Sequence, residues 1–344
     1  MKRILSFYSG RRQRRLSVVI LLLLVSALLK AWWLSAVVSD VLIVPPPLVH
    51  DLGHFRYSRS LRHYLDNTQL LIEPSSTACD GAQKVFYMAI VSSAPSNVDQ
   101  RAAIRRTWSA RQPTFFVLGI DVTQDSLVDT YLEAKENRDM IVFDFSDHYQ
   151  NLTLKTALML HWAHRRCPQA GVVLKTDDDV LVNPWAMMDV LMLHEDKQLV
   201  GYKRTDARAH RSEYTKWYLP RWLLPYDTIR EFLSGTGYVI QGAYIERILK
   251  AADSIPMINL EDVYFTYLVA QDYLGLTLTH EQKFSPYKPW LRTACAYWNL
   301  ASVHSLSPQE MVDAWAMIEP LGLYYEGEVI CKWSSFLSKD FFLY

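Results

Sequence analysis

Three consecutive aspartates, Asp177, Asp178 and Asp179, follow a short apolar run in the segment GVVLKTDDDVLVNPW. Alternate residues of an extended chain point the same way, so Asp177 and Asp179 can face one site while Asp178 turns aside. Paired carboxylates supply the hard oxygen donors that Mn²⁺ or Mg²⁺ prefers, and such an ion can hold a diphosphate. A hydrated acidic turn is the alternative, because charge runs commonly lie on the surface. The apolar residues 180–182 favour the ion site, since they continue a buried stretch.

A second acidic pair, Glu261 and Asp262, stands between an apolar lead-in and a helical apolar pattern in INLEDVYFTYLVAQDYLG. This position puts Asp262 at or near the start of a helix. A carboxylate there commonly caps the helix, so capping is its simplest role when the pair is considered alone. Residues 234–238 (SGTGY) allow a backbone to approach a ligand closely, although they match no phosphate-binding glycine motif and turn glycines are the default interpretation.

The segments that must position these acids alternate between strand-like and helix-like patterns. The strand-like apolar runs lie at residues 84–95, 115–119, 139–145 and 172–174. Residues 152–167 place apolar side chains three and four apart, which predicts a helix, and Asn183 before Pro184 predicts the start of another. This alternation predicts an α/β fold with a mostly parallel central sheet flanked by helices, in which ligands bind at the carboxyl ends of the strands.

The composition is that of a globular protein with an asymmetric charge distribution. Half of the 344 residues are hydrophobic and 21% are charged, values that exclude a disordered or fibrous chain. The 36 basic residues equal the 36 acidic ones, but six of the basic residues lie within positions 1–15, where no acid occurs. The remainder therefore holds 30 basic and 36 acidic residues, a net charge of −6 that argues against nucleic acid as a partner.

Residues 16–38 form an apolar run that contains only Lys30 and three serines as polar residues. At about 1.5 Å per residue the run is long enough to cross about 30 Å of hydrocarbon, so we expect one transmembrane helix. The basic cluster before it predicts a cytoplasmic tail at 1–15, a type II signal anchor at 16–38, a luminal stem without catalytic residues at 39–83 and a luminal folded domain at 84–344. A cleaved signal peptide is the alternative.

Four cysteines, Cys79, Cys167, Cys295 and Cys331, all lie beyond the apolar run, and no two have C-x-x-C spacing. An oxidising lumen would allow two disulfides, with three possible pairings that the sequence does not distinguish, and buried free thiols are the alternative. Asn151 begins an N-L-T glycosylation sequon, which is compatible with a secretory route.

Eight segments occur in an order and at spacings that resemble the β1,3-galactosyltransferase family, the inverting Golgi enzymes that also include β1,3-N-acetylglucosaminyltransferases. They are VSSAP, RAAIRRTW (101–108), FDFSDHYQNLTLKT (143–156), KTDDDVLVN, KWYLPRWLLP (216–225), SGTGY, LEDVY (260–264) and VHSLSPQEM (303–311). The resemblance implies a GT-A type nucleotide-sugar transferase fold, a UDP-sugar donor and a divalent metal, usually Mn²⁺. It also implies that the luminal domain is catalytic and that the protein resides in the Golgi membrane.

The resemblance also assigns individual residues. Asp179 matches the direct metal ligand, Asp177 lies near both metal and nucleotide ribose, and His304 matches the remaining protein ligand. Asp262 matches the general base of the family's E-D-V motif. The residues expected around the nucleotide are Arg101, Arg105, Lys155, Asp177 and Asp178; surface charge is the alternative for the basic ones. Asn151 falls in the family's own N-L-T segment, so it can be kept for packing.

The expected reaction moves galactose from UDP-galactose to the 3-hydroxyl of a glycan acceptor, because SGTGY with KWYLP resembles the galactosyl branch of the family. The alternatives are N-acetylglucosamine transfer from UDP-GlcNAc and a luminal sugar-binding relative without turnover. A metal phosphohydrolase is a third alternative, but the sequence lacks the second metal cluster that such an enzyme would need. The acceptor and the oligomeric state stay open.

Overall fold

The computed structural model describes residues 18–33, 47–75, 77–81, 85–120, 126–323 and 331. The chain divides into two compact units, Met1–Val49 and His50–Tyr344. The predicted cytoplasmic tail at 1–15 lies outside the described residues, as do positions 16–17 and 34–38 at the two ends of the predicted membrane helix.

The first unit contains one described helix, residues 18–33, whose side chains are exposed. Across the described part of the chain, no helix combines the length and the apolar character that crossing a membrane requires. This finding corrects the expectation of a transmembrane helix over 16–38.

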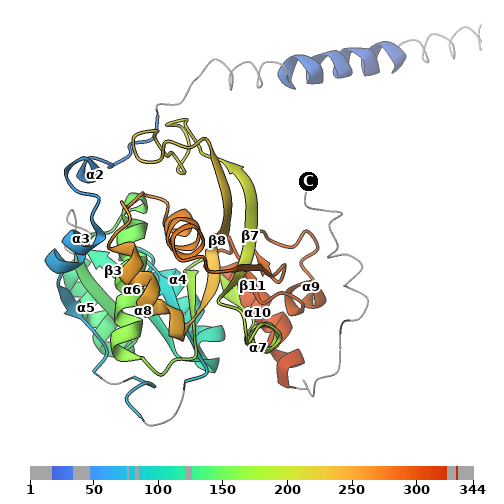
Figure 1. Ribbon diagram of the computed structural model, residues 1–344. Coiled ribbons are helices and arrows are strands. Elements are labelled where there is room, and N and C mark those ends of the chain that lie inside the picture. The colour runs from blue at the N-terminus through green and yellow to red at the C-terminus, as the bar shows by residue number, and fades with distance from the viewer. Residues whose placement is uncertain are drawn as a thin grey trace, which may run out of the picture. The chain divides into compact units, whose positions relative to one another are not determined.

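The second unit is built on an eight-stranded sheet with the order β1-β4-β3-β2-β5-β8-β7-β9. Figure 1 labels three of its strands, β3, β7 and β8. The strands are β1 (Leu70–Ile72), β2 (Tyr87–Ser92), β3 (Thr114–Ile120), β4 (Met140–Ser146), β5 (Val172–Asp177), β7 (Leu199–Arg208), β8 (Thr228–Gln241) and β9 (Leu278–His280).

Strand direction in this sheet is mixed, which corrects the expected mostly parallel arrangement. β2 to β5 run parallel to one another, but β1 is antiparallel to β4, and β8 is antiparallel to both β5 and β7. For β8 the reason is its connection to β7: residues 209–227 return the chain beside the strand it has just left, which gives an antiparallel pair, whereas a parallel pair needs a crossover.

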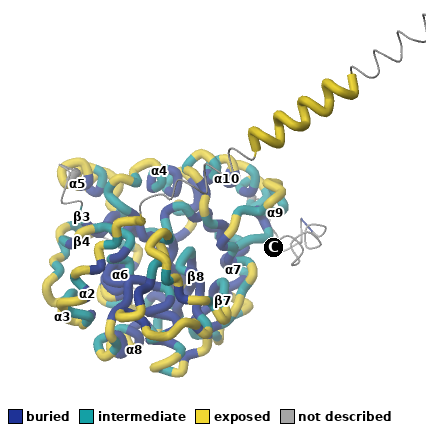
Figure 2. Tube along the Cα trace, turned by 90° about the horizontal axis from the view of Figure 1, so that it is seen from above, coloured by how far each residue is buried: buried dark blue, intermediate teal, exposed yellow. Residues whose placement is uncertain are grey.

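Helices cover both faces of the sheet. Because successive side chains of a strand point to opposite faces, each face has its own apolar core. Helices α6 (Leu152–Arg166) and α8 (Gly242–Ala252) cover one face, and α4 (Val98–Arg106) and α10 (Pro308–Leu323) cover the other (Figure 1). Met88 and Ile90 of β2 belong to the apolar core on the side of α6 and α8, whereas Ala89 and Val91 belong to the core on the side of α4 and α10. Further helices are η1 (Trp108–Arg111), α5 (Ser126–Asn137), η2 (Tyr149–Asn151), α7 (Pro184–Leu193), the π-helix η3 (Val263–Tyr273) and α9 (Ala294–Trp298). The central strands and α6 are largely buried (Figure 2).

Part of the predicted stem belongs to this unit. It supplies α2 (His54–Tyr57), α3 (Leu61–Asn67) and the edge strand β1. A disulfide between Cys79 and Cys167 ties this region to the residue that follows α6. The second disulfide joins Cys295 to Cys331, so all four cysteines are paired.

The N-L-T sequon is part of the packing at the start of α6. The amide nitrogen Nδ2 of Asn151 donates a hydrogen bond to the carbonyl of Ser146 at 2.8 Å. Thr153 is fully buried, and its hydroxyl donates to the carbonyl of Ile258 at 2.6 Å. Both polar side chains of the sequon therefore make hydrogen bonds within the protein, Asn151 from a half-buried position and Thr153 from a buried one.

Candidate metal centre and active site

The aspartate triplet lies where the central strand β5 ends. β5 is covered on both edges, by β2 and by β8, so its side chains alternate between two buried faces. The carboxylate of Asp178 turns inward and accepts hydrogen bonds from Ser93 Oγ at 2.7 Å and Asn97 Nδ2 at 2.9 Å. These bonds fix the turn and direct Asp177 and Asp179 the other way.

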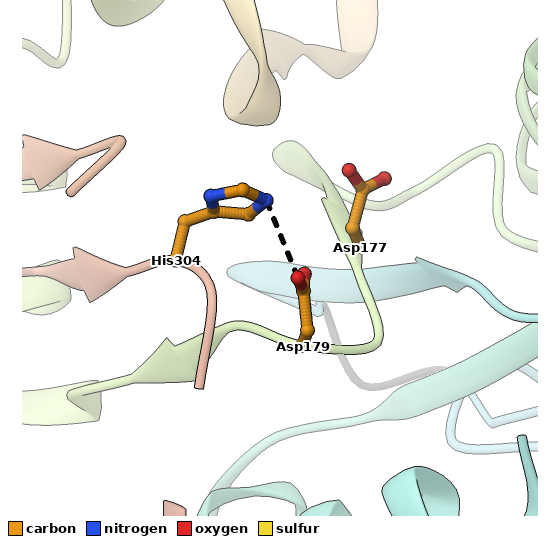
Figure 3. A group of neighbouring side chains, drawn as sticks. All are labelled: Asp177, Asp179 and His304. Carbon is orange, nitrogen blue, oxygen red and sulfur yellow. Dashed lines mark ion pairs between the residues drawn. The ribbon is translucent and has the colours of Figure 1, made fainter. Parts of the chain in front are cut away.

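A small second sheet brings His304 to this turn. It consists of β6 (Leu181–Val182), β10 (Phe284–Ser285) and β11 (Ser302–Val303), and β11 pairs antiparallel with β6, immediately after the triplet. One ligand atom from each of Asp177, Asp179 and His304 lies within 4.8 Å of the other two. His304 Nε2 is 3.4 Å from Asp179 Oδ2, and Figure 3 shows these two side chains facing each other with Asp177 beside them. We call these three residues the ion-binding trio.

The trio has the chemistry of a divalent-cation site. His304 Nδ1 lies 3.2 Å from the carbonyl of Pro286, which can accept the ring N–H and leave the lone pair of Nε2 facing the aspartates. Partial burial, together with the negative charges of Asp177 and Asp178, raises the pKa of Asp179 to about 6. A cation would relieve this excess of negative charge. Two carboxylates and one imidazole fit Mn²⁺ or Mg²⁺ completed by oxygen ligands from solvent or substrate.

Asp262 caps the start of η3, as the sequence predicts. Its carboxylate accepts hydrogen bonds from the backbone nitrogens of Val263 at 2.8 Å and Gly235 at 3.1 Å. Removal from water raises its pKa, although the residue keeps part of its surface exposed to solvent. Gly235 is required here: a Cβ at this position would lie 2.8 Å from Glu261 Oε1 and 3.3 Å from Asp262 Oδ2.

Lys175 places the ion-binding trio beside Asp262. Its ammonium group lies 2.8 Å from Asp177 Oδ1 and 2.9 Å from Oε1 of Glu261, the residue before Asp262. The other oxygen of Glu261 accepts a hydrogen bond from the Tyr238 hydroxyl at 2.9 Å. Lys175, Glu261 and Tyr238 are buried, so the two acidic sites share one desolvated centre.

Lys175 and Tyr238 were not among the residues expected from the sequence. A signal for Lys175 exists, because it stands two positions before Asp177 on a buried strand and therefore on the same face. A buried lysine needs negative partners, and the nearest acid on that face is Asp177.

The basic residues expected around the nucleotide are held by carboxylates of this chain. Arg101 is fully buried, and its guanidinium donates to both oxygens of Glu133 at 2.8 and 2.6 Å and to Ser93 Oγ at 2.9 Å. Arg105 donates to Glu133 at 2.7 Å and to both oxygens of Asp139.

Lys155 is engaged in the same way. Its ammonium donates to both oxygens of Asp147, at 2.7 and 2.8 Å, and to the carbonyl of Ser93. Arg101 and Lys155 thus fix the loop after β2 against which Asp178 rests. This geometry does not favour direct contact of these cations with a nucleotide, and that role stays a prediction.

Comparison with known proteins places these residues in a family. The galactosyltransferase family model matches residues 99–280, just over half of the chain, a span that includes the triplet, Lys175 and Asp262 but not His304. The chain belongs to the galactosyltransferase family. It is a sugar-transferring enzyme of that family.

Similar proteins cover most of the same region. "Beta-1,3-galactosyltransferase 5" of Mus musculus is 32% identical over 246 residues, which cover 68% of this chain and 79% of that protein. "Beta-1,3-galactosyltransferase 4" of Mus musculus is 30% identical over 287 residues, 72% of this chain and 76% of that protein. Among solved structures, a mannosyltransferase from Pyrobaculum calidifontis in complex with GDP-Man and Mn²⁺ covers 67% of this chain and 61% of its own, at 13% identity and a TM-score of 0.35, a likeness too weak to support an inference.

Proposed function

We propose that this protein transfers galactose from UDP-galactose to the 3-hydroxyl group of an acceptor sugar, with inversion at the anomeric carbon and with Mn²⁺ or Mg²⁺ as cofactor. The names of its similar proteins support galactose as the sugar and a β1,3 linkage as the product.

One observation carries the proposal: a partly exposed carboxylate, Asp262, stands beside the ion-binding trio. Lys175 links the two, because it contacts Asp177 on one side and Glu261 on the other. Inverting transfer from a nucleotide sugar requires charge stabilisation on the leaving diphosphate and a proton acceptor for the incoming hydroxyl. The centre supplies groups suited to both tasks within one cluster.

Asp262 acts as the general base in this proposal. The N–H groups of Val263 and Gly235 fix the plane of its carboxylate, and each oxygen keeps a lone pair for a substrate hydroxyl. The raised pKa makes the carboxylate a stronger proton acceptor than one in water. It accepts the proton of the acceptor 3-hydroxyl while that oxygen attacks the face opposite the leaving group, which converts an α-linked donor into a β-linked product.

Asp177, Asp179 and His304 are the residues that would hold the cation, which supplies positive charge to the diphosphate when bound. Asp178 keeps the turn in place through Ser93 and Asn97, so the two ligand carboxylates are oriented before a substrate arrives.

A donor panel tests the proposal. The purified full-length chain is incubated with Mn²⁺, methyl β-glycosides of galactose, N-acetylglucosamine and N-acetylgalactosamine, and each of UDP-galactose, UDP-GlcNAc and UDP-glucose, with EDTA as the control. We expect release of UDP from UDP-galactose, and NMR of the product should show a β1,3 linkage. Turnover of UDP-GlcNAc alone would assign N-acetylglucosamine transfer instead. Metal-dependent UDP binding without transfer from any donor would refute the proposal.

We also propose that the enzyme works in an oxidising compartment such as the Golgi lumen. The two disulfides support this, because such bonds persist in oxidising compartments and are rare in the cytosol. Colocalisation of the tagged chain with a Golgi marker, together with protection of its disulfides from thiol labelling in intact cells, would support this location. A uniformly cytosolic chain with four free thiols would contradict it.

A further inference from the structure

The loop at 209–227, which joins β7 to β8, exposes several aromatic side chains. Those more than a third exposed are Tyr214, Trp217, Trp222 and Tyr226. Exposed aromatic groups of this size cost hydration free energy unless a ligand or partner covers them, so several in one loop point to a binding surface.

Internal hydrogen bonds hold this loop in place. The backbone nitrogen of Leu219 donates to the carbonyl of His210 at 2.8 Å, and that of Ala209 donates to the carbonyl of Asp227 at 3.0 Å. The guanidinium of Arg211 donates to the carbonyls of Leu219 and Tyr226. Leu219 itself is fully buried. The exposed rings are therefore presented by a braced backbone, which limits the entropy lost when a ligand binds.

Among the exposed aromatic residues of this loop, Trp217 is connected through Lys216 to Tyr149. Its ring lies 5.4 Å from the ring of His210 and 5.4 Å from the ammonium nitrogen of Lys216. The same ammonium lies 5.5 Å from the ring centre of Tyr149. Lys216 thus stands between Trp217, which is 47% exposed, and Tyr149.

Tyr149 in turn lies directly before α6, and the Thr153 hydroxyl at the start of α6 donates to the carbonyl of Ile258 at 2.6 Å, four residues before Asp262. Burial, followed by the negative charges of Asp262 and Asp177, raises the pKa of the Tyr149 hydroxyl. A second contact joins the loop to the same region, because Asn259 Nδ2 donates to the carbonyl of Tyr218 at 3.0 Å and Asn259 stands three residues before Asp262. The loop at 209–227 therefore packs against the segment that leads into Asp262.

We propose that the indole of Trp217 is the platform on which the ring of the acceptor saccharide stacks, so that a ring hydroxyl reaches Asp262. A pyranose ring has a C–H face that packs on an aromatic face, and its hydroxyls can accept hydrogen bonds from the ammonium of Lys216. Trp217 is then a specificity-determining residue for the acceptor. This inference rests on the proposed transfer reaction, and it assigns Trp217 no part in donor binding.

The test compares Trp217→Ala, Trp217→Phe and the wild-type full-length chain, with Tyr273→Ala as a matched control because Tyr273 is 59% exposed at the far end of η3 from Asp262. The acceptor is the most active methyl β-glycoside of the panel above. We expect Trp217→Ala to raise the acceptor KM at least tenfold while the donor KM and the Kd for UDP with Mn²⁺ stay unchanged. Trp217→Phe should recover most of the loss, and Tyr273→Ala should match the wild type.

An unchanged acceptor KM in Trp217→Ala overturns the inference and leaves the proposed function standing. Equal losses in donor and acceptor KM, or a melting temperature well below that of the wild type in both Trp217 variants, also overturn it, because they indicate a structural role. If the wild type transfers no sugar to any acceptor, the proposed function fails, and the inference fails with it.

Discussion

The ammonium nitrogen of Lys175 lies 2.9 Å from Oε1 of Glu261, in the buried space between the ion-binding trio and Asp262. One lysine here faces the carboxylates of Asp177, Glu261 and Asp262, so negative charge exceeds positive charge in the absence of a cation. Burial first, and then the charges of Asp262 and Asp177, raises the pKa of Glu261 to about 7 despite the opposing effect of Lys175. The centre therefore stores electrostatic repulsion that protonation or a cation can relieve.

This pKa predicts how stability depends on pH. The ordinary value for the Glu261 carboxyl is 4.5, so the folded state binds its proton more tightly than the unfolded state. Its stabilising contribution is complete below about pH 4.5 and is lost as the pH rises through about 7, by at most about 1.4 kcal/mol per pH unit. Glu261→Gln should flatten this slope. Urea unfolding of both proteins without metal at pH 5, 6 and 7 measures it, and parallel profiles would argue against the assignment.

Replacing Asp262 by Asn should remove catalysis without weakening the binding of the nucleotide donor. The amide oxygen still caps η3, but the side chain no longer accepts a proton, so we expect transfer to fall roughly 10²- to 10⁴-fold. The Kd for UDP in Mn²⁺ should stay unchanged, as measured by calorimetry. Asp272→Asn, an exposed position near the end of the same helix, is the control and should retain full activity. Wild-type transfer by Asp262→Asn would refute the assignment of the base.

Replacing His304 by Ala should weaken the metal site. It removes one of the three ligand atoms that lie within 4.8 Å of one another. Loss of a group that merely supports a ligand costs roughly 10- to 100-fold in metal affinity, so we expect at least that increase in the Mn²⁺ concentration for half-maximal activity. His63→Ala, at an exposed position on α3, is the matched control. If the Mn²⁺ dependence is the same in both variants, His304 is not a ligand.

The sequon at Asn151 should carry no glycan. Its amide is bonded to the Ser146 carbonyl, and the Thr153 hydroxyl is buried against Ile258, so both contacts must open before a glycan-transferring enzyme can bind the sequon of the folded chain. The secreted or membrane fraction from mammalian cells should show the same mobility before and after peptide N-glycosidase treatment. Asn151→Asp, which removes the sequon and the amide donor, should lower the melting temperature. A mobility shift that Asn151→Asp abolishes would contradict this prediction.

The sequence predicts the local features of the site well. The apolar runs at 115–119 and 139–145 form β3 and β4, and the helix expected at 152–167 is α6. Asn183 caps α7 by accepting hydrogen bonds from the backbone nitrogens of Trp185 and Ala186, as the Asn-Pro pair indicates. Each of these features depends on residues close in sequence, where apolar spacing and capping chemistry are direct signals.

Features that depend on distant pairing could not be predicted in the same way. No local pattern shows that β8 enters the sheet beside β5 in the opposite direction, yet this pairing brings Gly235 against Asp262. The motif around Arg101 likewise indicates a positively charged side chain but not its partner. Glu133, 32 residues away, accepts the hydrogen bond of the guanidinium. The identity of a charged residue is local information, whereas its counter-ion is a property of the tertiary fold.

The acids lie on the central strand and at the helix start beside it, whereas the aromatic loop at 209–227 connects two strands at the surface. Substitutions of the exposed aromatic residues of that loop leave in place the contacts of Lys175 with Asp177 and Glu261, which set the spacing between Asp177 and Asp262. After gene duplication, substitutions in this one surface segment could therefore change the acceptor specificity of one copy, while the residues that form the glycosidic bond stay the same.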